Sequence, residues 1–517
     1  MCGIAAQYGT IDLSAADRML RRIAHRGPDD EGSVSIGGSW LGHRRLSIVD
    51  LHGGRQPLCN QPEDLWLVCN GEIYNHKAIR RELEDRRFIT DSDNEVILHL
   101  VDSRGPEAIS DLRGMFAFIV AGTNGRFLAA RDPVGIKPLY WARKDGCIQF
   151  ASELCTFDPH WRPYVELFPP GHYWTPKRGL VRFAAPIREL SRFCFRRPSK
   201  PGVEPPDHLL DQLRETLIDA VERHMMSDVP VGAFLSGGLD SSLVASIAAR
   251  YCRRKKLRLQ TFTVGTPDSA DLAAARRLAR FLDSDHYESI YNAKEAVALL
   301  PKVIRTVESF DPALVRSAVP NYPLAELAAQ HVKVVLTGEG ADELFAGYEY
   351  MRSHDNEIKL HAELVRLLEE FHGDGLQRCD RVAMAHGLEA RPPFMDLDVI
   401  ATALSIPAKW KLQTNGWPEK YLLRVAFDGW LPDDILWREK VQFGDGTGAG
   451  FKLRREAEAS VTNSEFERER TSAEPPLRSR EETAYYRVFR RYLDGIRPER
   501  TITRTVGQDL PEPSRLS

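Results

Sequence analysis

The residues with the clearest chemistry form a run rich in glycine and serine directly after a hydrophobic segment. The segment VGAFL is followed by SGGLDSS at residues 236–242 and then by the apolar stretch LVASIAARY. Glycines let a backbone approach phosphate oxygens, hydroxyls donate to them, and the N-terminus of a following helix adds free amides and a favourable dipole. The lysine of a Walker A loop is missing. The run therefore predicts a phosphate-binding loop between a strand and a helix.

A second glycine-rich turn carries carboxylates. The segment VVLTGEGADELFAGY places Glu339, Asp342 and Glu343 after another hydrophobic run. Carboxylates at the ends of parallel strands lie where ligands bind in open α/β sheets. An acidic loop alone is usually solvated surface. Beside a phosphate loop it becomes a candidate magnesium site, because hard cations bind carboxylate and phosphate oxygens together.

Cys2 stands directly behind the first methionine, in MCGIAAQYG. A thiol there is either an incidental residue of a frayed terminus or a nucleophile. Free cysteine, with a pKa of about 8.5, is mostly protonated at neutral pH and needs a base. If Met1 is removed, the α-amino group of Cys2, with a reference pKa of about 7.7–8.0, can accept the thiol proton.

Two segments of different character position these residues. Residues 1–190 hold short apolar runs separated by turn signals, which predicts an α+β domain rich in antiparallel strands. A linker rich in proline and charge is expected at 191–207. Residues 208–496 alternate buried runs with helical segments, which predicts an α/β domain with a parallel sheet. Residues 497–517 are expected to form a mobile tail.

Composition excludes several classes of protein. The 517 residues carry a formal net charge of −3, which argues against a general polyanion binder. No stretch approaches the roughly 20 apolar residues that a membrane helix needs. The eight cysteines contain no CxxC pair, so neither a zinc site nor a redox motif is indicated. We therefore expect a cytoplasmic protein with no nucleic-acid or membrane partner.

Several motifs together resemble one family. SGGLDSS, GEGADELFAGY, HGLEARPPFMD and LWREKVQFGDG follow MCGI in this order, and EETAYYRVFRR extends the match towards the C-terminus. This pattern is similar to that of the glutamine-hydrolysing asparagine synthetases. The resemblance implies an N-terminal class II glutamine amidotransferase domain, an αββα sandwich of the Ntn-hydrolase type. It also implies a C-terminal synthetase domain of the ATP-pyrophosphatase type, with ATP and Mg²⁺ as cofactors. A homodimer is one assembly compatible with the sequence.

For the N-terminal domain the resemblance implies a complete glutaminase site. Cys2 is the expected nucleophile, and Asn70 with the Gly71 amide forms the oxyanion hole. Arg45 suits the α-carboxylate of glutamine, while Glu72 and Asp93 balance its ammonium. Arg26, in AHRGPDDEG, is expected near the entrance of an internal ammonia tunnel.

For the C-terminal domain the resemblance implies an ATP site. Asp240 and Asp342 are expected to hold magnesium, Glu339 to deprotonate ammonia, and Lys440 to neutralise charge on the α-phosphate and leaving pyrophosphate. The expected ATP-binding residues are Leu235, Ser236, Gly237, Gly238, Asp240, Ser241, Ser242, Val264 and Gly338.

The implied reaction joins the two sites. Cys2 forms a glutamyl thioester and releases ammonia, which attacks an acyl-adenylate made from ATP and a carboxylic acid, releasing AMP and pyrophosphate. Aspartate, giving asparagine, is the default acceptor. Asp311, Arg316 and Ser317 are the expected acceptor-binding residues.

The acceptor segment departs from the family pattern. Ala313 and Leu314 replace a threonine pair, and Ser317 lies one place earlier than expected. A site that hydrogen-bonds a polar substrate group discriminates strongly through those bonds. The alternative is therefore an amide-forming ligase of specialised metabolism that uses a carboxylic acid other than aspartate.

Two other classes are disfavoured. A ring-closing synthetase typically loses the glutaminase cysteine and its glutamine clamp, and both are present here. A regulatory or nucleic-acid-binding protein would tolerate loss of Asp240, Asp342 and Lys440 and would need a basic face. Neither condition is met.

Overall fold

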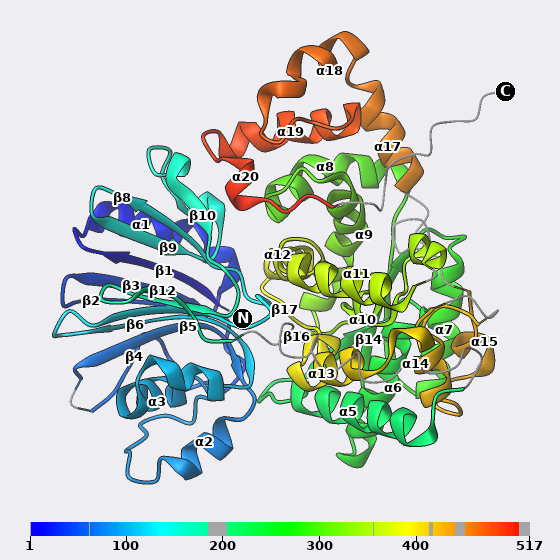
Figure 1. Cartoon of the computed structure of the whole chain (residues 1–517), viewed down its shortest axis with the longest axis horizontal. Coiled ribbons are helices and arrows are strands. Elements are labelled where there is room, and N and C mark those ends of the chain that lie inside the picture. Colours follow the sequence, from blue (N-terminus) through cyan, green and yellow to red (C-terminus); the bar gives the residue numbers. More distant parts are fainter. Residues whose placement is uncertain are drawn as a thin grey trace.

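The computed structural model describes residues 2–61, 63–184, 204–354, 356–412, 417–439 and 450–505. Two regions follow each other along the chain and pack side by side (Figure 1). Most of the expected linker, residues 191–203, and the position of Lys440 lie outside the described residues.

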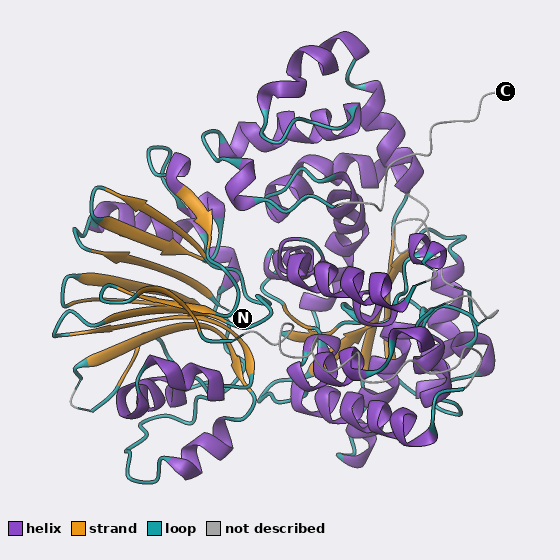
Figure 2. Cartoon of the chain, viewed as in Figure 1, coloured by secondary structure: helices purple, strands orange, loops and turns teal. Residues whose placement is uncertain are grey.

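The N-terminal region consists of two six-stranded sheets packed face to face (Figure 2). The first has the order β10-β8-β9-β1-β3-β2 and the second β12-β11-β7-β6-β5-β4. The strands of the first sheet are β1 (Gly3–Tyr8), β2 (Asp30–Ile36), β3 (Ser39–Arg45), β8 (Tyr140–Lys144), β9 (Cys147–Ala151) and β10 (Val165–Leu167). Those of the second are β4 (Leu58–Cys59), β5 (Leu65–Ile73), β6 (Gly114–Gly122), β7 (Phe127–Arg131), β11 (His172–Thr175) and β12 (Gly179–Arg182).

Helices cover the outer faces of both sheets. Helix α1 (Leu13–Arg22) packs on β1 and β3, and α3 (Glu95–Arg104) packs on β5 beside α2 (His76–Glu82). Asp12 caps α1 by accepting hydrogen bonds from the amides of Ser14 and Ala15. Because both faces of the sheets are covered, β5 and β6 are buried along almost their whole length. The expected αββα sandwich is confirmed.

The C-terminal region is built on a five-stranded parallel sheet, which confirms the expected α/β fold. Its order is β15-β14-β13-β16-β17. The strands are β13 (Val231–Phe234), β14 (Gln260–Gly265), β15 (Asp285–Ile290), β16 (Val334–Leu336) and β17 (Glu389–Arg391). After β13 the chain continues to β14 and β15 on one side of β13, and it later returns to form β16 and β17 on the other side. This reversal is a topological switch point, where open α/β sheets bind ligands beyond the carboxyl ends of their strands.

Helices surround this sheet (Figure 1). They are α5 (Asp207–His224), α6 (Leu239–Arg254), α7 (Ala270–Leu282), α8 (Ala293–Val307), α9 (Pro312–Ala329), α10 (Ala341–Phe345), α11 (Glu357–Glu370), α12 (Gly375–Met384), α13 (Leu397–Ser405), α14 (Tyr421–Ala426), α15 (Asp433–Leu436), α17 (Gly450–Ala459), α18 (Asn463–Glu469), α19 (Arg480–Leu493) and α20 (Pro498–Thr501).

The chain beyond residue 497 differs from the expected mobile tail as far as it is described. Residues 498–501 form α20, which packs on β10, and Arg500 pairs with Glu166 at 3.2 Å. Ile502 packs against the hydrophobic core that contains α8, α9 and α19. The polar composition of this segment hid these contacts, because they are made by scattered side chains rather than by an apolar face.

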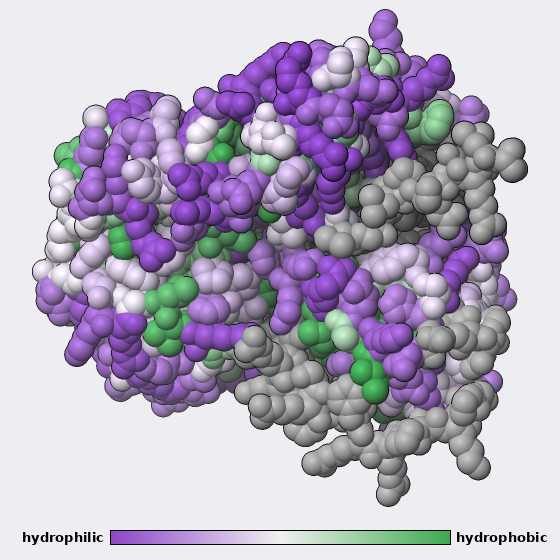
Figure 3. Space-filling view, turned by 45° about the horizontal axis from the view of Figure 1, so that its top comes forward, coloured by the Kyte–Doolittle hydropathy of each residue, from purple (hydrophilic) through white to green (hydrophobic). Residues whose placement is uncertain are grey.

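On the face drawn in Figure 3, hydrophilic residues dominate and hydrophobic residues occur in small separate groups. Among the described residues, no helix combines the length and the apolar character that crossing a membrane requires.

A buried network of charges joins the two regions. The guanidinium of Arg26 is fully buried; its Nη1 contacts Glu153 at 2.7 Å and Asp380 of α12 at 2.8 Å. Arg381, the next residue of α12, pairs with Glu153 at 2.9 Å and with Glu308 at 3.0 Å. The two regions are therefore held together by ion pairs that are buried away from water.

Replacing Asp380 with asparagine removes one charge from this network. A buried ion that loses its partner costs about 3–5 kcal/mol, so we expect Asp380→Asn to lower the urea midpoint of unfolding. Asp17→Asn is the matched control, because Asp17 pairs with Arg21 on the exposed face of α1, where such pairs contribute about 0–1 kcal/mol. Equal midpoints in the two variants would contradict a structural role for the Arg26 and Asp380 pair.

Candidate active sites

Cys2 directly precedes β1, and the N-terminal end of the chain lies beside the C-terminal region (Figure 1). The Cys2 amide nitrogen donates to Asn70 Oδ1 at 3.0 Å, and its carbonyl accepts from Arg26 Nε at 3.1 Å. Cys2 is buried, and this burial raises the pKa of its thiol. A buried neutral thiol becomes a nucleophile only when a base takes its proton, and the Cys2 nitrogen is an amino group able to do so only once Met1 is removed.

The expected oxyanion donors lie beside Cys2 on β5. Asn70 is fully buried, and its Nδ2 has no hydrogen-bond partner among the described residues. Gly71 passes so close to β6 that an added Cβ would lie 2.1 Å from the Met115 carbonyl oxygen, so only glycine fits. An unpartnered buried donor is costly and is the feature expected of a group that awaits a developing negative charge.

Arg45, the expected partner of the glutamine carboxylate, holds a backbone loop. Its Nη2 donates to the Asp50 carbonyl at 2.6 Å and to the Val49 carbonyl at 3.3 Å, and Nη1 donates to the Leu51 carbonyl at 3.2 Å. The loop therefore fixes the direction of the guanidinium before any ligand arrives.

Glu72 and Asp93 are buried carboxylates close to the same strand. Asp93 accepts a hydrogen bond from the Ile73 amide at 2.6 Å. Burial raises the pKa of Asp93 to about 7 and that of Glu72 well above its usual range, because the charged forms lose hydration. A cationic substrate group would stabilise both carboxylates in their charged form.

The C-terminal region contributes two residues to this site that sequence reasoning missed. Arg391 of β17 is fully buried, and its Nη2 lies 3.5 Å from Glu72 Oε2. Its Nε contacts Glu389 at 2.5 Å, and its Nη1 donates to the carbonyls of His224 and Met226. Both residues belong to the HGLEARPPFMD motif, but a motif does not reveal that an edge strand faces the other half of the molecule.

A cavity of about 470 Å³ lies beyond the carboxyl ends of β13 and β16. It brings together most of the residues expected from sequence. Those lining it are Leu235, Ser236, Gly238, Asp240, Ser241, Val264, Ala313, Arg316, Ser317, Gly338, Glu339 and Asp342. The phosphate-type loop, the acidic turn and the acceptor segment thus share one chamber.

The loop after β13 has the geometry of an anion cradle. Gly238 precedes α6 and offers no side chain to the amides of its first turn. Ser236 and Ser241 join their hydroxyls at 2.9 Å, and Ser242 donates to the Gly238 carbonyl at 2.6 Å instead of lining the cavity. Gly237 has a φ of +71° and packs on α7, where a Cβ would lie 2.5 Å from that of Ala274. Gly237 and Ser242 therefore shape the loop from behind.

Asp240 and Asp342 lie on either side of one cationic position. Lys420 Nζ contacts Asp240 at 2.5 Å and Asp342 at 2.6 Å. Although burial disfavours the charged amine, the two carboxylates raise the pKa of Lys420. Two carboxylates that share a cation beside an anion cradle fit a divalent metal ion as well. Sequence reasoning missed Lys420, which lies far along the chain from both carboxylates.

Glu339 lies in the same cavity with a guanidinium beside it. Its Oε2 accepts from Arg378 Nη2 of α12 at 2.5 Å. Burial raises the pKa of Glu339. The negative charges of Asp342 and Asp240 raise it further, whereas the positive charge of Arg378 lowers it. A carboxylate with a raised pKa is a better proton acceptor than an exposed one. Arg378 was also absent from the sequence prediction.

The acceptor segment is only partly as expected. Arg316 Nη1 contacts both carboxylate oxygens of Glu481, at 2.9 and 2.7 Å, and Ser317 Oγ donates to the Ala313 carbonyl at 2.9 Å. Leu314 is buried in the hydrophobic core and does not line the cavity. Asp311 does not line it either. Its carboxylate caps α9 instead, by accepting from the amides of Ala313 and Leu314.

Comparison with known proteins agrees with this two-site arrangement. A glutamine amidotransferase domain family matches residues 1–169, and the asparagine synthase family matches residues 212–359 and 350–495. A probable glutamine-hydrolysing asparagine synthetase of Dictyostelium discoideum is 36% identical over 99% of this chain and 96% of its own length. The chain belongs to the glutamine-hydrolysing asparagine synthetase family.

Other relatives agree. Asparagine synthetase 3 of Arabidopsis thaliana is 39% identical over 87% of this chain and 79% of its own length. A probable asparagine synthetase of Schizosaccharomyces pombe is 38% identical over 94% and 92%. The family resemblance inferred from the motifs is confirmed, and with it the enzyme class, a carbon–nitrogen ligase.

The raised pKa values in this synthetase's glutamine site predict a pH-dependent affinity. Carboxylates with raised pKa values are charged at high pH and gain protons at a higher pH than usual. We therefore expect the KM for glutamine to rise as the pH falls from about 8 to about 6, since Asp93, with a pKa of about 7, loses its attraction for the substrate ammonium.

Steady-state kinetics over this pH range tests the expectation. Protonation of the Cys2 amine affects kcat rather than KM, so the two effects separate. Asp93→Asn is expected to raise the KM at pH 8 and to flatten its pH dependence, while the KM for ATP stays unchanged. A KM for glutamine that is flat with pH in the unmodified enzyme would rule out this role of Asp93.

Proposed function

We propose that the protein is a glutamine-dependent asparagine synthetase. The observation that carries this proposal is the single cavity lined by the SGGLDSS loop, the Asp240 and Asp342 pair, Glu339 and the acceptor segment. The names of relatives that are 36–39% identical over most of the chain support asparagine as the product.

The first half-reaction uses the Cys2 site. Once Met1 is removed, the α-amino group of Cys2 takes the thiol proton, and sulfur attacks the side-chain amide carbon of glutamine; the amino group later gives that proton to the leaving ammonia. Asn70 Nδ2 and the Gly71 amide stabilise the oxyanion of the tetrahedral intermediate. The C–N bond breaks, ammonia leaves, and water hydrolyses the thioester to glutamate and free thiol. Arg45 binds the substrate carboxylate, while Glu72 and Asp93 bind its ammonium.

The second half-reaction uses the cavity of the synthetase region. The acceptor carboxylate attacks the α-phosphate of ATP, and pyrophosphate leaves, which gives an acyl-adenylate. Ammonia attacks the acyl carbon, Glu339 takes a proton, and AMP leaves with formation of the amide. Ser236, Gly238 and Ser241 cradle the phosphates. Lys440, which is expected to neutralise phosphate charge, lies outside the described residues.

Asp240 and Asp342 would hold Mg²⁺ in this proposal. Held there, the ion would offset negative charge on the phosphates of ATP and so make pyrophosphate a better leaving group. Lys420, which bridges the two carboxylates, would then turn towards the phosphates or remain as a second cation beside them.

A second candidate function differs only in the acceptor. Ala313 lines the cavity where the family pattern has a hydroxyl, so this wall offers one donor fewer to a polar acid. That observation favours an amide-forming ligase of specialised metabolism that uses another carboxylic acid. Leu314 contributes nothing to this alternative, because its side chain packs in the core.

A pyrophosphate-release assay across a panel of carboxylic acids separates the two functions. With glutamine and ATP present, we expect release with aspartate and formation of asparagine, because Arg316 and Ser317 still line the cavity. No pyrophosphate release with aspartate, together with release when another carboxylic acid is supplied, would reject asparagine synthesis and support the alternative.

Replacing Cys2 tests the glutaminase assignment. We expect Cys2→Ala to lose glutamine-dependent synthesis to background while ammonium salts still support the reaction, because only the nucleophile is removed. Asn70→Ala is the graded companion, expected to lose about 10²–10³-fold in glutaminase rate through its missing oxyanion donor. Glutamine-driven synthesis by Cys2→Ala would show that the nucleophile is another residue.

A further inference from the structure

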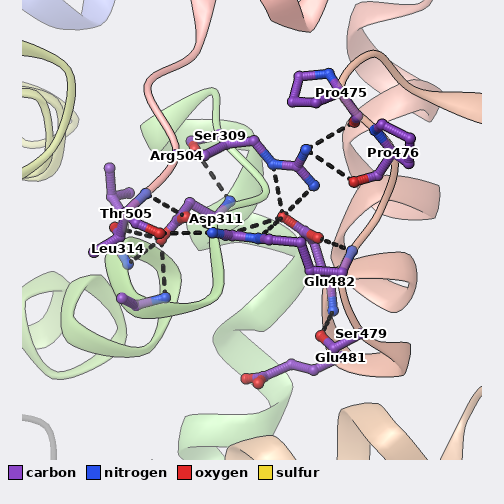
Figure 4. A network of polar contacts seen from close by, with 12 residues as sticks. Ser309, Asp311, Leu314, Pro475, Pro476, Ser479, Glu481, Glu482, Arg504 and Thr505 are labelled. Atoms are coloured by element: carbon purple, nitrogen blue, oxygen red, sulfur yellow. Dashed lines mark hydrogen bonds and ion pairs between the residues drawn. The ribbon is translucent and has the colours of Figure 1, made fainter. Parts of the chain in front are cut away.

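Residues 502–505 contact the capping residue of α9, the helix whose first turns line the acceptor end of the cavity. Asp311, fully buried, accepts from the Ala313 and Leu314 amides at 3.0 and 3.2 Å. The same carboxylate accepts from the Thr505 amide at 3.0 Å and from Thr505 Oγ1 at 2.9 Å (Figure 4). One carboxylate therefore joins the start of the helix to the chain near its C-terminal end.

Arg504, the preceding residue, ties the same segment to the start of α19. Its Nε donates to Glu482 Oε1 at 2.9 Å, and its Nη1 donates to the carbonyls of Pro475 and Pro476 at 2.7 and 3.1 Å (Figure 4). The guanidinium also lies over the Phe310 ring, 5.6 Å from its centroid. Glu482 is fully buried, so Arg504 provides the charge that its burial requires.

The start of α19 in turn holds the acceptor end of α9. Glu481 pairs with Arg316, which lines the cavity, at 2.7 Å. Arg478 Nη2 donates to Asp311 at 2.8 Å and also contacts Glu482 at 3.2 Å. Arg316 is thus positioned by its ion pair with Glu481 at the start of α19. The position of this helix end depends in turn on Asp311, to which Thr505 donates, and on Glu482, with which Arg504 pairs.

A second wall of the cavity meets the same segment. Phe371 and Asp374 line the cavity, and Gly373 between them is in such close contact with Thr503 that an added Cβ would lie 2.0 Å from Thr503 Oγ1. The segment therefore packs behind two walls of one chamber.

We propose that residues 502–505 form a strap that fixes the first turns of α9 and thereby sets the affinity for the acceptor acid. Arg504 and Thr505 are positioning residues, since they act through Asp311, Glu482 and Arg316. This inference rests on the proposed function, because it takes the acceptor to bind beside Arg316. A displacement of about 1 Å at a substrate-binding group can change catalysis about 10²-fold.

Two shortened enzymes test the strap. One ends at Thr501 and lacks the contacts that residues 502–505 make; its control ends at Thr505 and retains these residues. We expect the first to raise the KM for the acceptor about 10- to 100-fold, with the KM for ATP and the glutaminase rate within about twofold of the control. An unchanged acceptor KM in the Thr501 form overturns the inference.

Point variants keep the test valid if the shorter form does not fold. Thr505→Val removes the hydroxyl donor to Asp311 and keeps the side-chain shape, whereas Thr505→Ser keeps the donor. We expect Thr505→Val to raise the KM for the acceptor several-fold and Thr505→Ser to leave it at the value of the unmodified enzyme. Equal KM values in both variants would show that the hydroxyl does not position the site.

Hydrogen exchange separates failure of the strap from failure of the proposed function. The amides of Ala313 and Leu314 should exchange faster in the Thr501 form than in its control, while peptides of the N-terminal sheets exchange equally in both. Unchanged exchange at these amides overturns the strap whatever the acceptor is. Faster exchange in an enzyme that turns over no carboxylic acid supports the strap as an anchor of α9 and rejects the proposed acceptor chemistry instead.

Discussion

The buried guanidinium of Arg26 is the interaction on which the rest of the structure depends. It donates to the Cys2 carbonyl and contacts Glu153 on its own side and Asp380 across the interface. A guanidinium can satisfy three partners at once because its donors project in a fixed plane. The residue that bonds the backbone of Cys2 is therefore also a residue that joins the two halves.

Electrostatic coupling between the halves follows from the same docking. Glu72 belongs to the glutaminase half, but the cation nearest to it is Arg391, which β17 carries at the edge of the synthetase sheet. Burial alone would favour a protonated Glu72. Glu389 of the same strand raises the pKa of Glu72 further, whereas the Arg391 guanidinium lowers it by favouring the carboxylate. The charge state of Glu72 therefore depends on two residues of the other region.

Sequence predicted the chemistry that lies close to glycine-rich turns and missed the charges that approach from elsewhere. Ser236, Asp240, Glu339 and Asp342 follow hydrophobic runs directly, and parallel strands bring their ends to one edge, so a local pattern was enough. Lys420, Arg378 and Arg391 reach the same sites from distant segments; Arg391 lies in a recognisable motif, but no local pattern shows which site any of the three faces. Asp311 was identified from the right segment, but a residue directly before a helix serves that helix first. The alternation of buried runs with helical segments predicted the C-terminal fold, and short apolar runs between turn signals predicted the strand-rich N-terminal region, because both patterns reflect burial, which is a local property.

The wall of the cavity formed by Ala313, Arg316 and Ser317 at the start of α9 depends both on its own residues and on contacts with distant segments. Ala313 removes a hydroxyl from the cavity, which lowers the polarity of the first turn of α9. Arg316 keeps its charge, but its Nη1 already contacts both carboxylate oxygens of Glu481. If the acceptor acid binds beside Arg316, as we propose, it shares this guanidinium with a carboxylate of the protein, and its affinity depends on how firmly α19 holds Glu481 in place. Substitutions far from the cavity, at the Pro475 turn or at Arg504, can then alter acceptor preference without changing any residue that touches the substrate. In the proposed function, selectivity for the acceptor thus depends on the contacts behind this wall of the cavity as much as on the residues that line it.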